Sequence, residues 1–165
     1  MRFVRNVSGR FESRFVHVRV DPSTPSLLLR GMTNSVLGVW CSHGEGRALF
    51  PDPSLGDMVT KQGLAPLRYC DDDGTATERY PMNPNGSPGG VAALCSADGR
   101  HTAMMPHPER SFLQWQLPHV PPDLEERMHA VEADAARAGC PTPSPWINMF
   151  HAMREWLDDN ESRSL

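Results

Sequence analysis

The stretch His-Thr-Ala-Met-Met-Pro-His-Pro-Glu-Arg, residues 101–110, predicts a short strand that ends at a proline. Pro108 disfavours a helical conformation at His107 and fixes its own φ, so the segment from His107 to Glu109 should be extended. In an extended chain, residues i and i+2 project to the same side. The Glu109 carboxylate can then accept a hydrogen bond from one imidazole nitrogen and leave the other as a proton acceptor. These are the base and the orienting acid of a nucleophilic triad, without its nucleophile.

A His-x-Glu tripeptide also occurs by chance. The alternative interpretation is a surface turn with a partly solvated histidine. The preceding strand and the intervening proline favour the catalytic interpretation, because together they fix where the two side chains point.

Upstream of residue 101, short strand-like runs alternate with turns. β-Branched and aromatic residues predict strands at residues 11–20, 36–41, 64–69, 76–80, 91–96 and 101–105. The turns Asp71-Asp72-Asp73-Gly74 and Ala97-Asp98-Gly99-Arg100 each place Asp-Gly between two such runs, which predicts two β-hairpins. The second hairpin leads directly to His107.

The loop Ser42-His43-Gly44-Glu45-Gly46-Arg47 follows the predicted strand at 36–41. Polar groups at a strand end are typical of ligand sites in open α/β sheets. Gly44 and Gly46 permit close approach of the backbone to a ligand. The loop is not a P-loop, because no Gly-Lys-Ser/Thr follows. We consider residues 43–47 candidate substrate-binding residues; the alternative is a tight connection with a solvated ion pair.

After residue 110 the pattern becomes helical. Apolar residues recur at helical spacing from Leu124 to Ala138, and Gly139 is a typical stop signal. In the last segment Ser144 is the predicted N-cap and Pro145 the first helical position. An apolar stripe from Trp146 to Leu157 predicts a helix that packs against the core.

The whole chain has the composition of one ordinary domain. It has 165 residues, of which 39% are hydrophobic, and a mean hydropathy of -0.46. A formal charge of -4 argues against a nucleic-acid partner or an anionic membrane surface. No apolar run is long enough to span a membrane, and no targeting signal is evident, so we expect a cytoplasmic protein.

The four cysteines do not predict a metal site. Cys41, Cys70, Cys95 and Cys140 are not paired at metal-ligand spacing, and no histidine cluster accompanies them. Cys41, Cys70 and Cys95 lie in or beside apolar runs, which indicates small buried thiols. We therefore expect neither a metal nor another cofactor.

Several longer sequence motifs follow one another along the chain. They begin with Arg2-Phe3-Val4-Arg5-Asn6, Arg10-Phe11-Glu12, residues 42–47 and Leu67-Arg68-Tyr69. They continue with residues 77–81, 83–88, 96–100, 104–110 and Ser144-Pro145-Trp146. In these motifs the chain resembles the C-terminal glutaminase domain of the phosphoribosylformylglycinamidine synthase family, also called formylglycinamide ribonucleotide amidotransferases. Only residues from about 114 to 142 depart from the family pattern, and we expect a helical insertion there.

The resemblance implies an α/β fold. Residues 1–165 would be the C-terminal part of a class I glutamine amidotransferase domain, which is flavodoxin-like, with a mixed sheet, β-hairpins and a C-terminal helix. It implies glutamine as the substrate, and an ammonia product consumed by an upstream synthetase part of the same enzyme, together with ATP and formylglycinamide ribonucleotide. By the same resemblance His107 is the triad base and Glu109 its orienter, and residues 43–47 lie beside the glutamine pocket. The loop at 83–88 is a candidate for lining the site or for facing the synthetase part; rigid scaffolding is the alternative.

The chain departs from the family pattern at the nucleophile. In the family a cysteine stands at a strand-to-helix elbow upstream of the motif that begins at Arg2, and none of the four cysteines here lies in such an elbow. The elbow's backbone donors to the oxyanion are missing with it. We therefore expect a chain that is inactive alone, its thiol supplied by an upstream segment or a partner chain. The alternatives are a non-catalytic remnant that acts as a binding module, and a freestanding hydrolase that uses one of its own cysteines.

Overall fold

The computed structural model describes residues 1–161, apart from the side chains of residues 123, 127 and 161. The strands are β1 (Arg2–Val4), β2 (Glu12–Val20), β3 (Val36–His43), β4 (Arg47–Leu49), β5 (Leu67–Cys70), β6 (Ala93–Cys95), β7 (Thr102–Met104) and β8 (Pro106–His107). The α-helices are α1 (Pro53–Lys61), α2 (Pro122–Ala138) and α3 (Asn148–Glu161). Short 3-10 turns occupy Leu27–Leu29, Pro88–Gly90, Pro108–Arg110, Gln114–Gln116 and Pro145–Ile147.

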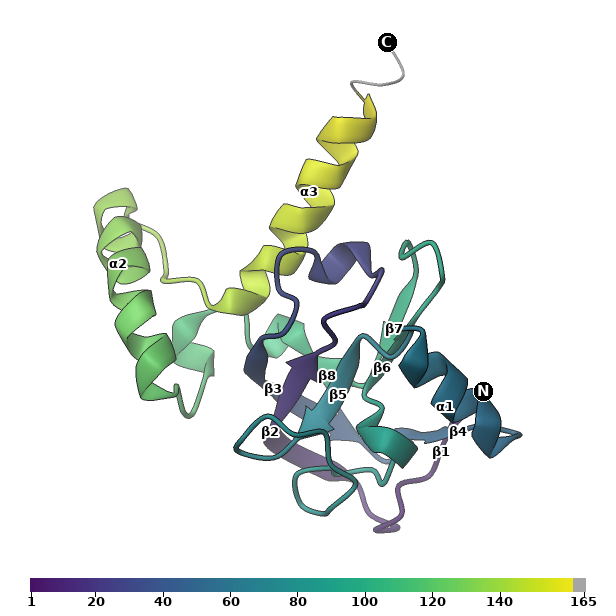
Figure 1. Cartoon of the computed structure of the whole chain (residues 1–165). Helices are drawn as coiled ribbons and strands as arrows, with labels where there is room; N and C mark the ends of the chain where they lie inside the picture. Colours follow the sequence, from purple (N-terminus) through teal and green to yellow (C-terminus); the bar gives the residue numbers. More distant parts are fainter. Residues whose placement is uncertain (162–165) are drawn as a thin grey trace.

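The central sheet has the strand order β5-β2-β3-β8, and two smaller sheets pair β1 with β4 and β6 with β7. Every one of these pairings is antiparallel. Figure 1 shows the sheets gathered in one body, with α1 beside them near the N-terminus. The predicted combination of sheets, hairpins and a C-terminal helix is confirmed.

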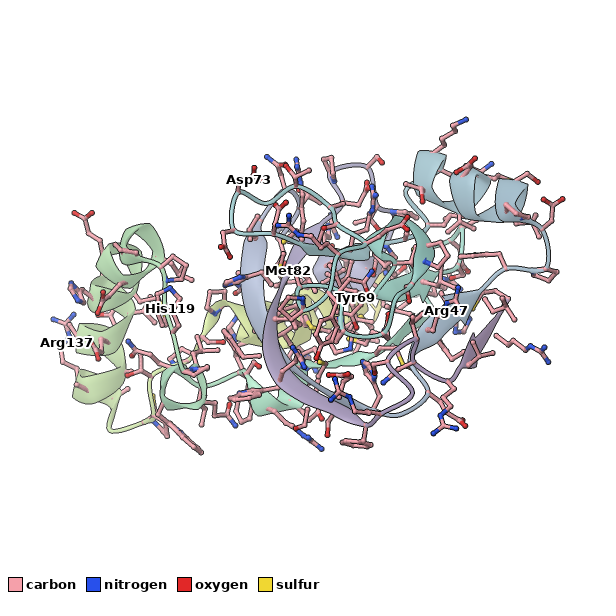
Figure 2. All side chains as sticks on the ribbon, turned by 90° about the horizontal axis from the view of Figure 1, so that it is seen from below. Arg47, Tyr69, Asp73, Met82, His119 and Arg137 are labelled. Carbon is pink, nitrogen blue, oxygen red and sulfur yellow. The ribbon has the colours of Figure 1, made fainter. Side chains whose placement is uncertain are left out.

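Alternation along β2 and β3 places one face of the central sheet in the core. Val16, Val18 and Val20 are buried, and the residues between them are not. Leu37 and Val39 of β3 are buried opposite Val18 and Val16 in the ladder, and Cys41 is buried on the same face. Tyr69 of β5 is also fully buried, and Figure 2 shows it among the side chains of the body's centre. Apolar area removed from water by this face is the main source of stability.

One predicted strand is wrong. Residues 76–80 form no strand; only an isolated bridge between Cys70 and Ala76 marks the expected hairpin. The chain curls instead, because the Asn83 side chain donates to the carbonyls of Thr77 and Ser87. Side-chain donors of this kind compete with a strand ladder for the same backbone groups. The hairpin at residues 91–105, by contrast, is confirmed as the β6–β7 pair.

Helices α2 and α3 stand outside the sheet body (Figure 1). Gly139 ends α2 in the left-handed region, with φ of 67°, as its position predicts. Ser144 accepts a hydrogen bond from the Trp146 backbone amide and Pro145 follows it, which confirms the predicted cap. The first turn after the cap is a 3-10 turn, and α3 itself begins at Asn148. The apolar stripe that follows is only partly core: Met149 is buried, but Phe150 and Leu157 are exposed. No helix within residues 1–161 is long and apolar enough to cross a bilayer.

Candidate functional site

The histidine and the glutamate predicted to act together are hydrogen-bonded. Nδ1 of His107 lies 2.6 Å from Oε1 of Glu109. The His107 side chain is 30% exposed and that of Glu109 is 60% exposed, so the pair lies at the surface. Nδ1 is occupied by the carboxylate, which leaves Nε2 as the nitrogen that can exchange a proton with a reacting group. The geometry is that of a base held by an orienting acid.

The main sheet holds this dyad in place from two directions. β8 pairs with β3, with His107 opposite Trp40 and Pro106 opposite Cys41. The segment after the dyad returns to the same strand, since the Trp40 backbone amide donates to Ser111 Oγ and the Trp40 indole donates to the Gln116 carbonyl. The segments before and after the dyad are therefore both hydrogen-bonded to β3.

The glycine loop at 42–47 is held from within the protein. Gly46 donates its backbone N–H to Asn6 Oδ1, and its carbonyl accepts from Asn85 Nδ2. Asn6 also donates from its side chain to the His43 carbonyl, at 2.8 Å. Glycine here gives the backbone close packing against these amides. Asn83, Asn85 and Ser87 are all buried, and the side chains of Asn85 and Ser87 bond to the backbone of Gly46 and Ala48.

His43 is the buried member of that loop. Neither of its ring nitrogens has a hydrogen-bond partner among the described residues. Burial lowers the pKa of His43, and the charge of His107 lowers it further while the charge of Glu12 raises it. A lowered pKa keeps the ring neutral at physiological pH, with one donor and one acceptor nitrogen.

The glycine loop and the dyad are neighbours rather than partners. No hydrogen bond or ion pair within residues 1–161 joins His107 or Glu109 to residues 43–47. Their relation is electrostatic, through the influence of His107 on His43. Glu45 is exposed and Arg47 is half-buried, and neither is ion-paired with His107 or Glu109.

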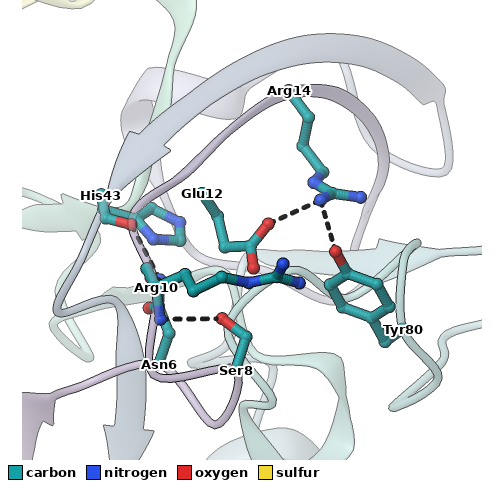
Figure 3. A network of polar contacts seen from close by, with 7 residues as sticks. All are labelled: Asn6, Ser8, Arg10, Glu12, Arg14, His43 and Tyr80. Atoms are coloured by element: carbon teal, nitrogen blue, oxygen red, sulfur yellow. Dashed lines mark hydrogen bonds and ion pairs between the residues drawn. The ribbon is translucent and has the colours of Figure 1, made fainter.

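A polar cluster that the sequence did not point to lies at the end of the β2–β3 ladder. Glu12 pairs with His43 in register, on the face that carries the core. Its carboxylate is bonded to Arg14, and Arg14 is bonded to the Tyr80 hydroxyl at 2.7 Å (Figure 3). The alternation of side chains along β2 could have predicted that Glu12 is buried, because position 12 is in phase with Val16, Val18 and Val20.

The cysteines offer no nucleophile beside the dyad. Burial raises the pKa of the Cys41 thiol to about 11 and that of the Cys70 thiol to about 12. A thiol with so high a pKa is almost entirely protonated at neutral pH and is a poor nucleophile. Among the described residues no group of three or more His, Cys, Asp or Glu side chains could hold a metal ion.

The two glycines of the loop make a matched test of its packing. A Cβ added at Gly46 would lie 2.6 Å from His43 Nδ1, whereas one added at Gly44 would meet nothing closer than Phe11 Cδ2 at 3.7 Å. We expect Gly46→Ala to lower the free energy of unfolding by about 1–3 kcal/mol, because the buried His43 ring would have to shift to avoid the added Cβ. Gly44→Ala should change it by less than about 0.5 kcal/mol. Urea denaturation of both variants measures the difference, and equal losses would contradict the packing.

The site can now be set beside known proteins. The family model described as the CobB/CobQ-like glutamine amidotransferase domain matches residues 1–157. The chain is 56% identical over 157 residues to the Arabidopsis thaliana protein named "Probable phosphoribosylformylglycinamidine synthase, chloroplastic/mitochondrial", covering 95% of this chain and 10% of that protein. It is 50% identical over 151 residues to the Homo sapiens phosphoribosylformylglycinamidine synthase, covering 92% of this chain and 10% of that protein.

The same stretch of chain is small beside these relatives, since it spans about a tenth of their length. Among solved structures, the one titled "Structure of PurLQS from Thermotoga maritima" is similar, with 24% identity and a TM-score of 0.49. That likeness covers 69% of this chain and 44% of the other.

Proposed function

Because the chain belongs to the CobB/CobQ-like glutamine amidotransferase domain family, we propose that it is the C-terminal part of the glutaminase domain of a phosphoribosylformylglycinamidine synthase. The observation that carries this is the 2.6 Å contact between His107 Nδ1 and Glu109 Oε1 at an accessible position. The similarity to synthases named for this reaction supports the substrate, glutamine.

In the proposed mechanism His107 is the base and a cysteine from an upstream segment or partner chain is the nucleophile. His107 Nε2 takes the thiol proton as the sulfur attacks the glutamine amide carbon. It returns that proton to the leaving nitrogen when the C–N bond breaks, which releases ammonia and leaves a γ-glutamyl thioester. Water then attacks the thioester carbon with His107 again accepting a proton. The C–S bond breaks, glutamate leaves and the thiol regains its proton.

Glu109 orients the ring and stabilises its protonated form without itself becoming protonated. The ammonia would pass to an upstream synthetase part, which consumes ATP and formylglycinamide ribonucleotide in purine biosynthesis. Residues 43–47 would border the glutamine pocket, and α2 would be the helical insertion within residues 114–142. We place the protein in the cytoplasm; its Arabidopsis thaliana relative is named as chloroplastic or mitochondrial.

Reconstitution tests this function. The chain is mixed with an upstream segment that carries the elbow cysteine, and glutamate and ammonia are measured by a coupled dehydrogenase assay. We expect no hydrolysis by the chain alone and turnover in the mixture. Cys41→Ser should leave that turnover unchanged, because the Cys41 thiol is buried and has a raised pKa.

Two results would contradict the proposal. An inactive mixture, with both parts folded and associated, would indicate a non-catalytic binding module. Hydrolysis by the chain alone that Cys41→Ser abolishes would identify a freestanding hydrolase.

A further inference from the structure

An open hollow lies beside the dyad. It has a volume of about 400 Å³. The residues that line it are Trp40, Arg110, Trp115, Gln116 and Pro118. Two of its walls belong to the surroundings of the dyad, because Trp40 is opposite His107 in the ladder of β3 and β8, and Arg110 ends the 3-10 turn that contains Glu109. The hollow and the dyad are therefore parts of one surface.

Register and charge both connect this hollow to the dyad. Residues paired across a ladder project to the same face of the sheet, so the Trp40 and His107 side chains share a face. Arg110 Nε lies 3.7 Å from Glu109 Oε1, which is the same oxygen that contacts His107 Nδ1. One carboxylate oxygen thus contacts both the His107 ring and a wall of the hollow.

Trp115 is the most exposed large apolar side chain of the described residues, at 76%. Its exposure does not come from a loose segment, because Trp115 is the middle residue of the 3-10 turn Gln114–Gln116. The Gln116 side chain accepts the Leu113 backbone N–H at 2.9 Å, and the Gln116 carbonyl accepts the Trp40 indole N–H at 2.8 Å. The turn is held at both ends, so an incoming partner meets an aromatic ring on an ordered backbone, which lowers the entropic cost of association.

We propose that Trp115 and the hollow dock the segment that carries the nucleophile cysteine. The inference rests on the proposed function and names the surface that this partner contacts. A thiol that gives its proton to His107 Nε2 must lie about 3 Å from it, so the segment that bears the thiol has to cover the surface around the dyad. The chain spans about a tenth of the length of its relatives, and most of the length of those proteins lies outside it.

The side chains of this surface suit a protein partner. Tryptophan and arginine are among the residues that most often carry the binding energy of protein interfaces. An apolar side chain of the segment would fill the hollow that Trp40 and Trp115 line. The Arg110 side chain is 53% exposed, and its guanidinium can donate to a carboxylate or a backbone carbonyl of the segment.

The test measures association and turnover separately. The upstream segment that carries the elbow cysteine is titrated into the chain, and its Kd is determined by isothermal titration calorimetry. Trp115→Ala should raise that Kd about 10- to 100-fold, because truncation of a tryptophan that becomes buried is among the costliest changes at an interface. Glutamate release should recover when the segment is in excess, since the dyad is intact. Trp115→Phe should have a smaller effect on the Kd.

Met58→Ala is the matched control. Met58 is another exposed apolar side chain, at 43%, and it lies on α1. Figure 1 shows α1 across the sheet body from α2 and from the segment that leads into α2. This variant should leave the Kd for the segment within about twofold of the value for the unchanged chain.

Three results would overturn the inference. The first is a Kd for Trp115→Ala within about twofold of the unchanged value, or an equal weakening by Met58→Ala. The second is the absence of any association between chain and segment. The third is self-association of the chain, measured by analytical ultracentrifugation, that Trp115→Ala abolishes without changing the Kd for the segment, because the surface would then serve a second copy of the chain.

These outcomes are separate from failure of the function itself. If chain and segment associate with the expected dependence on Trp115 but hydrolyse no glutamine, the glutaminase proposal fails and the docking surface stands. If they hydrolyse glutamine and the Kd does not depend on Trp115, only the assignment of the docking surface fails.

Discussion

His107→Asn is expected to reduce glutamine hydrolysis by the reconstituted amidotransferase at least about 10³-fold. Asparagine occupies similar space and can still hydrogen-bond to Glu109, but it cannot accept the thiol proton at neutral pH. The residual rate would come from binding and orientation alone. The measurement is kcat for glutamate release, with folding checked by circular dichroism.

The control for that variant is His101→Asn. His101 is an exposed histidine just before β7, in the same hairpin, and its ring forms no hydrogen bond or ion pair within residues 1–161. It should leave kcat within about twofold of the unchanged chain, since exposed substitutions away from a site have small effects. If His107→Asn retained more than a tenth of the turnover, His107 would not be the base. Turnover driven by added ammonium salts in a complete synthase should survive His107→Asn, because that route bypasses hydrolysis.

Trp146→Ala is expected to lower the free energy of unfolding by about 3–5 kcal/mol. Trp146 is 1% exposed, and its indole N–H donates to the Gly38 carbonyl at 2.8 Å. The substitution leaves a cavity between β3 and the 3-10 turn that leads into α3, and it removes the indole donor to the Gly38 carbonyl. Urea denaturation, with the midpoint and slope fitted together, measures the loss.

Trp115→Ala is the matched control for the same residue type. Trp115 is 76% exposed and should change stability by less than about 0.5 kcal/mol. Trp146→Phe should be intermediate, since it keeps most of the ring volume and loses the hydrogen bond. Similar losses at positions 115 and 146 would mean that the attachment of α3 to the sheet does not depend on the buried indole.

The dyad could be predicted because it depends on local geometry. The extended conformation expected for residues 107–109 is wrong, because Pro108–Arg110 form a 3-10 turn. The two residues are nevertheless so close in sequence that this single turn brings their side chains together without a distant contact. The hairpin at 91–105 was predictable for the same reason, since its turn residues are adjacent in sequence. Ser144 and Pro145, which begin the 3-10 turn that leads into α3, are also a local signal.

The parts that were missed depend on contacts between distant segments. Residues 76–80 have strand-like composition, but Asn83 ties up their backbone from outside the pattern. Helix α1 buries no residue, so its apolar periodicity is weak; only Asp52 as N-cap and Pro53 at the first position signal it. Glu12 lies inside the predicted strand at 11–20, and its burial beside Arg14 and the contact of Arg14 with Tyr80 depend on how distant segments pack.

The buried side chains of Asn6 and Ser87 make the glycine loop rigid. The amide protons of Gly46 and Ala48 are held by these two side chains rather than by water. A segment whose composition suggests mobility is therefore anchored as firmly as the sheet, and its amide protons should exchange with solvent as slowly as those of β3. Its glycines provide clearance for neighbouring atoms, and the rigidity comes from amide and hydroxyl groups that are far away in the sequence.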